Sequence, residues 1–262
     1  MNKHVIHYSF GITSAVTASL VIKEKGKENT ILLFHDTKEE ANDCYRFGRE
    51  VAAYLGMSIT EKSDGRSVTQ LFKDEKYLGN NRNTPCSRVL KQEQGNRYVK
   101  EFIECGYDVT IYEGMTSPDD NHRLTGRRAA FADLGADVRF PLIEQHLSKD
   151  DCKRIVIECW GIRLSDSYNH FEHDNCLNRG CVKGGLAYYG LLYLYKHEAW
   201  KKAAAEEEEF GHSILSSERY GAFPKSSLRM LQQRSIIAAH NWEARRAQGD
   251  LLPLMVQPCV CL

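Results

Sequence analysis

The sequence predicts an α/β fold in which helices flank a parallel, twisted, Rossmann-like sheet, with a helical C-terminal extension. Short apolar segments that suit strands alternate with longer segments at helical spacing, in the order strand, loop, helix, strand, loop, helix. That order is typical of right-handed crossover units and therefore of a parallel sheet. With 262 residues, the chain is also long enough to bury a sizeable core.

The first predicted strand covers residues 4–8 and the first helix residues 15–25. The turn between them is built from small and hydroxyl-bearing residues. A strand, a tight turn and a helix start form a geometry that presents backbone N–H groups to an anion. Gly11 lets a phosphate oxygen approach the main chain, and hydroxyl groups add donors. The turn lacks the Walker pattern. The predicted phosphate-binding residues are Ser9, Phe10, Gly11, Ile12, Thr13 and Ser14.

The second predicted strand, residues 30–35, is followed by a helix over residues 39–55. Because ligands of parallel sheets bind beyond the carboxyl ends of the strands, His35, Asp36 and Thr37 are expected beside the phosphate turn. Capping of the strand end is the alternative role for these polar residues. Gly114, which ends a later strand, is expected at the same edge of the sheet.

The remaining segments complete the α/β pattern. A helix begins at Pro85-Cys86-Ser87, and Ser148 caps another. Four glutamates, 206–209, predict a solvated helix face. We expect a nucleotide-binding domain over residues 1–185 and a helical region over 186–262. The predicted segments are strands at 57–62, 109–114 and 138–143, helices at 68–73, 85–105, 149–160 and 186–209, a polar turn from Asp119 to Arg128, an irregular stretch at 161–183, a broken helical region at 213–248 and a tail at 251–262.

Composition narrows the function classes. The 35 basic and 35 acidic residues balance, so no overall positive field draws the chain to nucleic acid. No signal peptide precedes the first strand and no apolar run approaches 18 residues, which predicts a cytoplasmic protein with no membrane partner. Nine cysteines in a reducing compartment favour metal or catalytic thiols over disulfides. Four of them fall within predicted helices or strands and suit small apolar positions, namely Cys44, Cys105, Cys152 and Cys159.

Cys176 and Cys181 lie four residues apart around a glycine, in a loop that can bring two thiols together. Three interpretations stay open from the residues alone. The thiols are reduced and bind nothing; they bind zinc together with His170 and His173; or they hold an iron–sulfur cluster together with a cysteine from elsewhere in the chain.

The turn at residues 9–14 resembles the S-G-G-x-D/T-S pyrophosphate loop of the N-type ATP pyrophosphatases and the PAPS/APS (sulfonucleotide) reductases, within the adenine nucleotide alpha hydrolase superfamily. It departs from that loop in two places. Phe10 replaces a residue that is usually glycine, and Thr13 stands where ATP-using members often carry Asp. The string from His35 to Glu40 resembles the family's second block, which holds the adenine and ribose. The resemblance is best to proteins of phages and mobile elements.

The segment Cys86-Ser87-Arg88-Val89-Leu90-Lys91 resembles a helix start that carries paired cysteines in cluster-bearing APS reductases. The resemblance implies that Cys86, Cys176 and Cys181 hold a 4Fe–4S cluster. Three thiolates would leave one iron open for sulfide or substrate, as is understood for the tRNA 2-thiolation branch of the superfamily. Zinc is the alternative metal.

The function implied is adenine-nucleotide-dependent sulfur transfer to a nucleic-acid base or a related acceptor. ATP phosphates would lie on the loop at residues 9–14, with Asp120 as a Mg²⁺ ligand and Arg88 and Arg123 as phosphate clamps. Surface salt bridges are the alternative role for these three side chains. The expected partners are an adenine nucleotide (ATP or PAPS), a sulfur donor or thiol reductant, and a tRNA or DNA acceptor.

Two other functions compete. The first is a PAPS/APS reductase that uses Cys259 or Cys261, because the family's Glu-Cys-Gly-Leu-His motif is absent and the chain ends in Cys-x-Cys. The second is a catalytically silent nucleotide-binding protein with structural zinc or no metal, which the departures at Phe10 and Thr13 favour. The apolar segment 187–195 also suits packing against a second copy in a homodimer.

Overall fold

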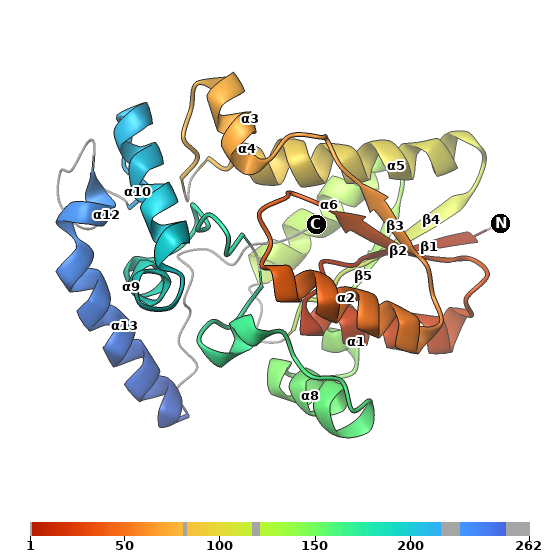
Figure 1. The fold of residues 1–262 in the computed structure, drawn as a ribbon. Coiled ribbons are helices and arrows are strands. Elements are labelled where there is room, and N and C mark those ends of the chain that lie inside the picture. Colours follow the sequence, from red (N-terminus) through yellow and green to blue (C-terminus); the bar gives the residue numbers. More distant parts are fainter. Residues whose placement is uncertain (1, 81–82, 117–120, 175, 216–225, 250–262) are drawn as a thin grey trace.

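The computed structural model describes residues 2–80, 83–116, 121–174, 176–215 and 226–249. Five strands form one parallel sheet in the order β3-β2-β1-β4-β5 (Figure 1). The predicted α/β class is therefore confirmed. The strands are β1 (Asn2–His7), β2 (Thr30–His35), β3 (Ile59–Lys62), β4 (Asp108–Tyr112) and β5 (Asp137–Arg139).

Each face of the sheet carries its own layer of helices and its own core (Figure 1). Successive residues of a strand point to opposite faces, so Ile6 and Leu32 join one core while Val5 and Leu33 join the other. This explains why apolar residues are consecutive, not alternating, at Val5 and Ile6 of β1 and at residues 31–34 of β2. The first core is covered by α1 (Ile12–Lys25) and α2 (Asn42–Leu55), and the second by α5 (Glu93–Glu104) and α6 (Asn121–Leu134).

Shorter elements connect these layers. Ser148 caps α8 by a reciprocal capping box with Asp151, as the sequence predicts for a helix start there. The predicted extended segment 138–143 is only partly right, because Pro141 begins a helical turn directly after β5. These elements are α3 (Val68–Glu75), α4 (Pro85–Ser87), the π-helical turn η1 (Arg88–Gln92), α7 (Pro141–Glu144), α8 (Lys149–Arg154), the π-helical turn η2 (Ile155–Cys159) and the 3₁₀ turn η3 (Asp166–Asn169).

The prediction of a polar turn at residues 121–128 is wrong, since this stretch belongs to α6. Its sequence offers few apolar residues, and Phe131 is its main contribution to the core. The guanidinium groups of Arg127 and Arg128 lie 4.6 and 5.5 Å from the ring centroids of Phe131 and Phe140. Arginine stems therefore supply packing that a hydrophobic pattern does not reveal.

Four helices form the C-terminal part of the described chain, beside the sheet domain (Figure 1). The predicted single helix 186–209 is interrupted at Lys196, whose φ of −140° and ψ of 54° leave the helical region. The predicted boundary at residue 185 stays a prediction, and ion pairs such as Lys202 to Glu39 cross it. The helices are α9 (Leu186–Tyr195), α10 (His197–Phe210), α12 (Ser227–Met230) and α13 (Gln232–Ala247).

The prediction that glutamates 206–209 form a solvated face is wrong for the first two. Glu206 is 4% exposed and forms an ion pair with Arg179, and its carboxylate also accepts a hydrogen bond from Thr69 at 2.6 Å. Glu207 is fully buried and accepts hydrogen bonds from the backbone N–H groups of Ile214 and Leu228. Buried carboxylates of this kind are retained where such partners compensate for lost hydration.

The apolar helix α9 packs against α13 and α10 of the same chain. At the crossing with α13, a Cβ atom on Gly190 would lie 1.9 Å from the carbonyl oxygen of Ser235. Glycine is thus required for the two backbones to approach. Part of the surface on which a homodimer was predicted is covered within the chain, and the dimer stays a prediction.

We expect Gly190→Ala to destabilise the protein by about 1–3 kcal/mol, because the added methyl group meets backbone atoms of α13 and forces the helices apart. Urea unfolding at neutral pH measures this change. Gly126→Ala is the matched control: that glycine lies in α6 with open space around it, so alanine should stabilise by about 0.5–1 kcal/mol. Equal effects at the two positions would contradict the packing described here.

Candidate functional site

The carboxyl ends of β1 and β4 meet at the start of α1. Gly114, two residues after β4, lies so close to α1 that a Cβ atom there would be 2.8 Å from the backbone N of Ser14 and the carbonyl carbon of Thr13. The predicted placement of Gly114 beside the turn at residues 9–14 is therefore found in the structure. Its contact is with the protein backbone, and the nucleotide-binding role assigned to it stays a prediction.

The loop at residues 9–14 turns sharply at Phe10, whose φ is +64°. This left-handed conformation suits glycine and costs other residues about 1 kcal/mol or more. Here the cost is offset by packing: Phe10 is 2% exposed and stacks on Phe34 with the ring centroids 3.7 Å apart. The side chain points into the core, so the departure from glycine does not fill the ligand side of the loop.

The first turn of α1 has no side-chain cap, because its N-cap residue is Gly11. Such a helix start leaves backbone N–H groups available to an anion. The N–H of Ile12 already donates to the hydroxyl of Tyr168, at 3.3 Å. The hydroxyl of Ser14 donates to the Gly11 carbonyl at 2.9 Å, and Ser9 and Thr13 are half-buried at the loop.

The second predicted block follows β2 at the same edge. The ring of His35 is buried and lies edge-on to that of His7, with the centroids 6.0 Å apart. Asp36 is half-buried, and its carboxylate accepts hydrogen bonds from the Tyr45 hydroxyl at 2.6 Å and the Lys38 N–H at 2.8 Å. Burial, together with this hydrogen bond to Asp36, raises the pKa of Tyr45.

A buried carboxylate, Glu40, joins three segments of the site. It accepts a hydrogen bond from the Thr37 hydroxyl at 3.0 Å and forms an ion pair with Lys91 at 3.3 Å. Its second oxygen accepts from the backbone N–H of Cys176 at 2.7 Å. Glu40 and Lys91 are 2% and 5% exposed, so they form a buried ion pair. Glu40 thereby ties the loop after β2 to η1 and to the cysteine loop.

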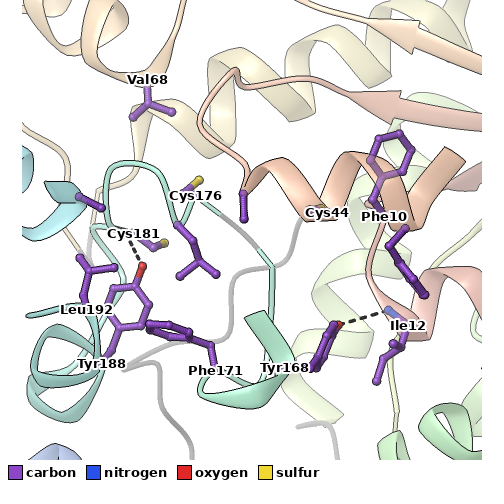
Figure 2. Packing of buried hydrophobic residues seen from close by; sticks show 14 of the residues in the cluster. Phe10, Ile12, Cys44, Val68, Tyr168, Phe171, Cys176, Cys181, Tyr188 and Leu192 are labelled. Atoms are coloured by element: carbon purple, nitrogen blue, oxygen red, sulfur yellow. Dashed lines mark hydrogen bonds between the residues drawn. The ribbon is translucent and has the colours of Figure 1, made fainter. Parts of the chain in front are cut away.

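Cys86, Cys176 and Cys181 line one narrow cavity of about 10 Å³, together with Thr37 and Lys91. Figure 2 shows Cys176 and Cys181 near Tyr188, whose hydroxyl accepts a hydrogen bond from the backbone N–H of Cys181 at 2.9 Å. The structure therefore brings Cys86 together with the two cysteines of the loop, whereas their predicted role as metal ligands stays a prediction. Cys86 is half-buried and the other two are buried.

The donor chemistry of this cavity suits a thiophilic metal or cluster, but the arrangement does not. Within the ranges that the structure describes, no group of three or more His, Cys, Asp or Glu side chains could hold a metal ion. The zinc set predicted with His170 and His173 is likewise not assembled, because these rings stack on Tyr195 and Tyr188 of α9. The cavity is also too small for a cluster as it stands.

A second, wider hollow of about 330 Å³ opens beside the cysteine cavity, and both are lined by Thr84, Ser87 and Lys183. Arg88 and Arg127 also line this hollow, which therefore carries three cationic side chains. Arg88 is exposed and pairs with Glu93 at 2.6 Å. Arg123, the other predicted clamp, lies in α6 and is not among the residues that line either hollow.

Arg127 is held in place by strand ends. Its Nε lies 3.0–3.1 Å from both carboxylate oxygens of Glu113, which in turn lies 3.2 Å from Nδ1 of His7. Burial alone would raise the pKa of Glu113, but the hydrogen bond from His7 and the charge of Arg127 outweigh it, so the pKa lies below its ordinary 4.5. The carboxylate stays ionised and orients the guanidinium.

Three predicted residues, Asp120, Cys259 and Cys261, lie outside the described residues. The structure adds residues that sequence reasoning did not assign to the site, namely Glu40, Lys91, Glu113, Arg127 and Lys183. Glu40 lies three positions after Thr37, and Lys91 lies five positions after Cys86. Their closeness in sequence to predicted site residues could have indicated both. Lys183 follows Cys181 by two positions and Arg127 belongs to the predicted polar turn, so both lay near predicted features, whereas no local pattern indicated Glu113.

Residues 3–135 match the family model described as the phosphoadenosine phosphosulfate reductase domain. This match spans half of the chain and includes the loop at residues 9–14, the block after β2 and Cys86. The chain belongs to the phosphoadenosine phosphosulfate reductase domain family. The family predicted from sequence motifs is confirmed. Its phage or mobile-element type stays a prediction.

Two solved structures are similar in part. The phosphoadenylyl-sulfate (PAPS) reductase from Candida auris, a phosphate complex, is 16% identical over 64% of this chain and 76% of that chain, with a TM-score of 0.41. A predicted subunit of a tRNA methyltransferase from Methanocaldococcus jannaschii is 16% identical over 62% of this chain and 89% of that chain, with a TM-score of 0.34. No curated protein matches the sequence. Across the described helices, none has the length and apolarity needed to cross a membrane.

We expect Glu113→Gln to destabilise the protein by about 3 kcal/mol at pH 7, because Arg127 and His7 lose a buried carboxylate. Since the folded pKa of Glu113 is depressed, wild-type stability from this group is present above pH 4.5 and lost as pH falls through the folded pKa. Urea unfolding of both proteins between pH 7 and pH 3.5 measures the difference. A difference that does not shrink on acidification would contradict an ionised Glu113.

Proposed function

We propose that this protein catalyses adenine-nucleotide-dependent sulfur transfer to a nucleic-acid base or related acceptor. The observation that carries the proposal is the shared cavity of Cys86, Cys176 and Cys181. This cavity lies at the carboxyl edge of the sheet, where Thr37 lines its wall and Glu40 links it to the loop after β2. Membership of a sulfonucleotide-using family supports an enzyme of sulfur chemistry.

The adenine nucleotide binds with its phosphates on residues 9–14. Gly11 supports this placement, since its φ of −87° is open to any residue and a Cβ atom there would make only ordinary contacts, at 3.5 Å or more. Neither backbone strain nor packing calls for glycine, so two reasons for it remain, its position as the N-cap of α1 and close approach of a ligand, and the proposal adopts the second. The adenine and ribose lie toward His35, Asp36 and Thr37. Mg²⁺ bound through Asp120 belongs to the same proposal.

The reaction proceeds in two steps. An acceptor carbonyl oxygen attacks the α-phosphorus of ATP, forming an O–P bond and releasing pyrophosphate. A sulfide-class nucleophile then attacks the activated carbon, the C–O bond breaks, and AMP leaves with both bonding electrons. Lys91 stabilises negative charge beside the thiols, and Arg88 neutralises phosphate oxygens at the entrance.

The finer form of the proposal is a 4Fe–4S cluster held by Cys86, Cys176 and Cys181. Three thiols in one cavity support it in donor chemistry. It requires the side chains to move closer together than they stand, since the described residues do not form a metal site. When bound, such a cluster would supply a site for exogenous sulfide.

A PAPS/APS reductase is the second candidate, and the matching family model favours it. In that reaction a thiolate attacks the sulfate sulfur, the S–O bond to the nucleotide breaks, and adenosine 3′,5′-bisphosphate leaves with the bonding electrons. A second thiolate then attacks the cysteine sulfur of the S-sulfonate, a disulfide forms, and sulfite leaves, so that the two thiols are oxidised as the sulfate is reduced. Cys259 and Cys261 are the thiols that this chain would use. Release of sulfite from PAPS by the wild-type chain, and its loss in Cys259→Ser/Cys261→Ser, would support this candidate.

Anaerobic purification followed by iron, acid-labile sulfide and AMP-formation assays tests the first proposal. We expect about four iron atoms per chain, lost in Cys86→Ala, Cys176→Ala and Cys181→Ala. The same variants should lower ATP-dependent AMP formation with tRNA and sulfide at least tenfold, because the sulfur nucleophile loses its binding site.

Cys105→Ala and Cys159→Ala are matched controls, because both thiols are exposed and lie outside the cavity. They should keep wild-type iron content and activity. Zinc in place of iron would exclude the cluster. Unchanged AMP formation in all three cavity variants would exclude sulfur transfer at these thiols.

A further inference from the structure

The wider hollow lies beside the cysteine cavity, and no residue of the loop at residues 9–14 is among those that line it. Its volume of about 330 Å³ falls at the lower end of the range for small-molecule sites, which suits one nucleotide-sized unit. Its described lining contains three cationic residues and no carboxylate. The other described residues of the lining are polar, Asn83, Thr84, Ser87 and Gln92.

The charges of the hollow are only partly neutralised. Arg127 is paired with buried Glu113, and Arg88 is paired with exposed Glu93. Lys183 forms no ion pair with any described residue. An exposed pair such as Arg88–Glu93 contributes little and opens easily to an incoming ligand. The hollow therefore offers a half-buried, paired guanidinium, an exposed guanidinium and an ammonium group to one oxyanion.

We infer that this hollow is a second oxyanion site, which binds a phosphate or sulfate ester of the substrate that meets the thiols. Three shared lining residues, Thr84, Ser87 and Lys183, connect it directly to the cysteine cavity. An ester group held there places the adjoining nucleotide unit at the entrance to Cys86. The inference deepens the proposed function and rests on it for the role of the thiols, while the site itself rests on the hollow alone.

The oxyanion comes from one of two sources, a phosphate of a nucleic-acid acceptor or the phosphate and sulfate groups of a sulfonucleotide. Both have tetrahedral oxygens that guanidinium groups bind by charge-assisted hydrogen bonds. The two sources differ in one testable respect. An acceptor binds while ATP occupies the loop at residues 9–14, whereas a sulfonucleotide competes with ATP.

Equilibrium binding to the full chain, purified anaerobically, tests the inference. The probes are ATP, a 5′-phosphorylated trinucleotide with saturating ATP present, and adenosine 3′,5′-bisphosphate. We expect Lys183→Gln and Arg88→Gln each to weaken binding of the trinucleotide or the bisphosphate about tenfold. Each variant should also reduce the salt dependence by about one counterion. Binding of ATP to Lys183→Gln should change less than about twofold, because this lysine has no role toward ATP in the proposed function.

Lys100→Gln is the matched control, since this lysine is exposed on α5 and lines neither hollow. It should bind every probe as the wild type does, and thermal unfolding checks that all variants fold. Trinucleotide binding alongside ATP identifies the acceptor as the source, and competition between the bisphosphate and ATP identifies a sulfonucleotide.

Wild-type affinity of both Lys183→Gln and Arg88→Gln for the trinucleotide and the bisphosphate would overturn the second site. Failure of the proposed function looks different. In that case the wild type does not bind ATP, yet it binds the phosphorylated probe in a manner that depends on Lys183.

Discussion

The buried carboxylate of Glu40 connects the parts of the site that come from distant segments. It meets the Thr37 hydroxyl, the Lys91 ammonium and the backbone N–H of Cys176, each from a different element. A carboxylate that is 2% exposed is costly unless such partners compensate for its lost hydration. This requirement fixes the cysteine loop against the loop after β2, and it brings thiols to the edge where we propose that a nucleotide binds.

A second buried carboxylate, Glu113, connects distant segments in the same way and lies directly after β4, the strand on the other side of β1 from β2. It links His7 at the end of β1 to Arg127 in α6, and so directs a guanidinium into the wider hollow. The strand order β3-β2-β1-β4-β5 explains why both networks meet at one edge. Successive crossovers run in opposite directions from β1, and the gap between β1 and β4 is where ligands bind in such sheets.

Sequence reasoning predicted the elements whose apolar pattern is strong and the residues that belong to local motifs. The strand at residues 30–35 agrees to the residue, and the three cysteines were grouped although they are separated by up to 95 positions (181 − 86). It missed α6, where arginine stems cover Phe131, and it misjudged Glu206 and Glu207, whose partners come from other segments. Burial of a charged residue depends on tertiary partners, which no local pattern contains.

Phe10, which replaces the family's usual glycine, is a second case in which the local sequence does not predict how a side chain packs. A bulky residue in a glycine position suggests a blocked loop, yet the ring lies in the core against Phe34. The resemblance of the loop identifies the family, whereas the packing of Phe10 shows that this substitution does not block the loop. The intact ligand side of the loop is consistent with a nucleotide beside the thiols.

The most direct test of this shared site is differential alkylation of the cysteines with and without ATP, read residue by residue by mass spectrometry under anaerobic conditions. Cys86 is half-buried at the cavity, whereas Cys105 and Cys159 are exposed elsewhere and serve as internal references. We expect saturating ATP to slow alkylation of Cys86 severalfold and to leave Cys105 and Cys159 unchanged. Equal rates at Cys86 with and without ATP, at concentrations where ATP is bound, would contradict a site in which nucleotide and thiols meet.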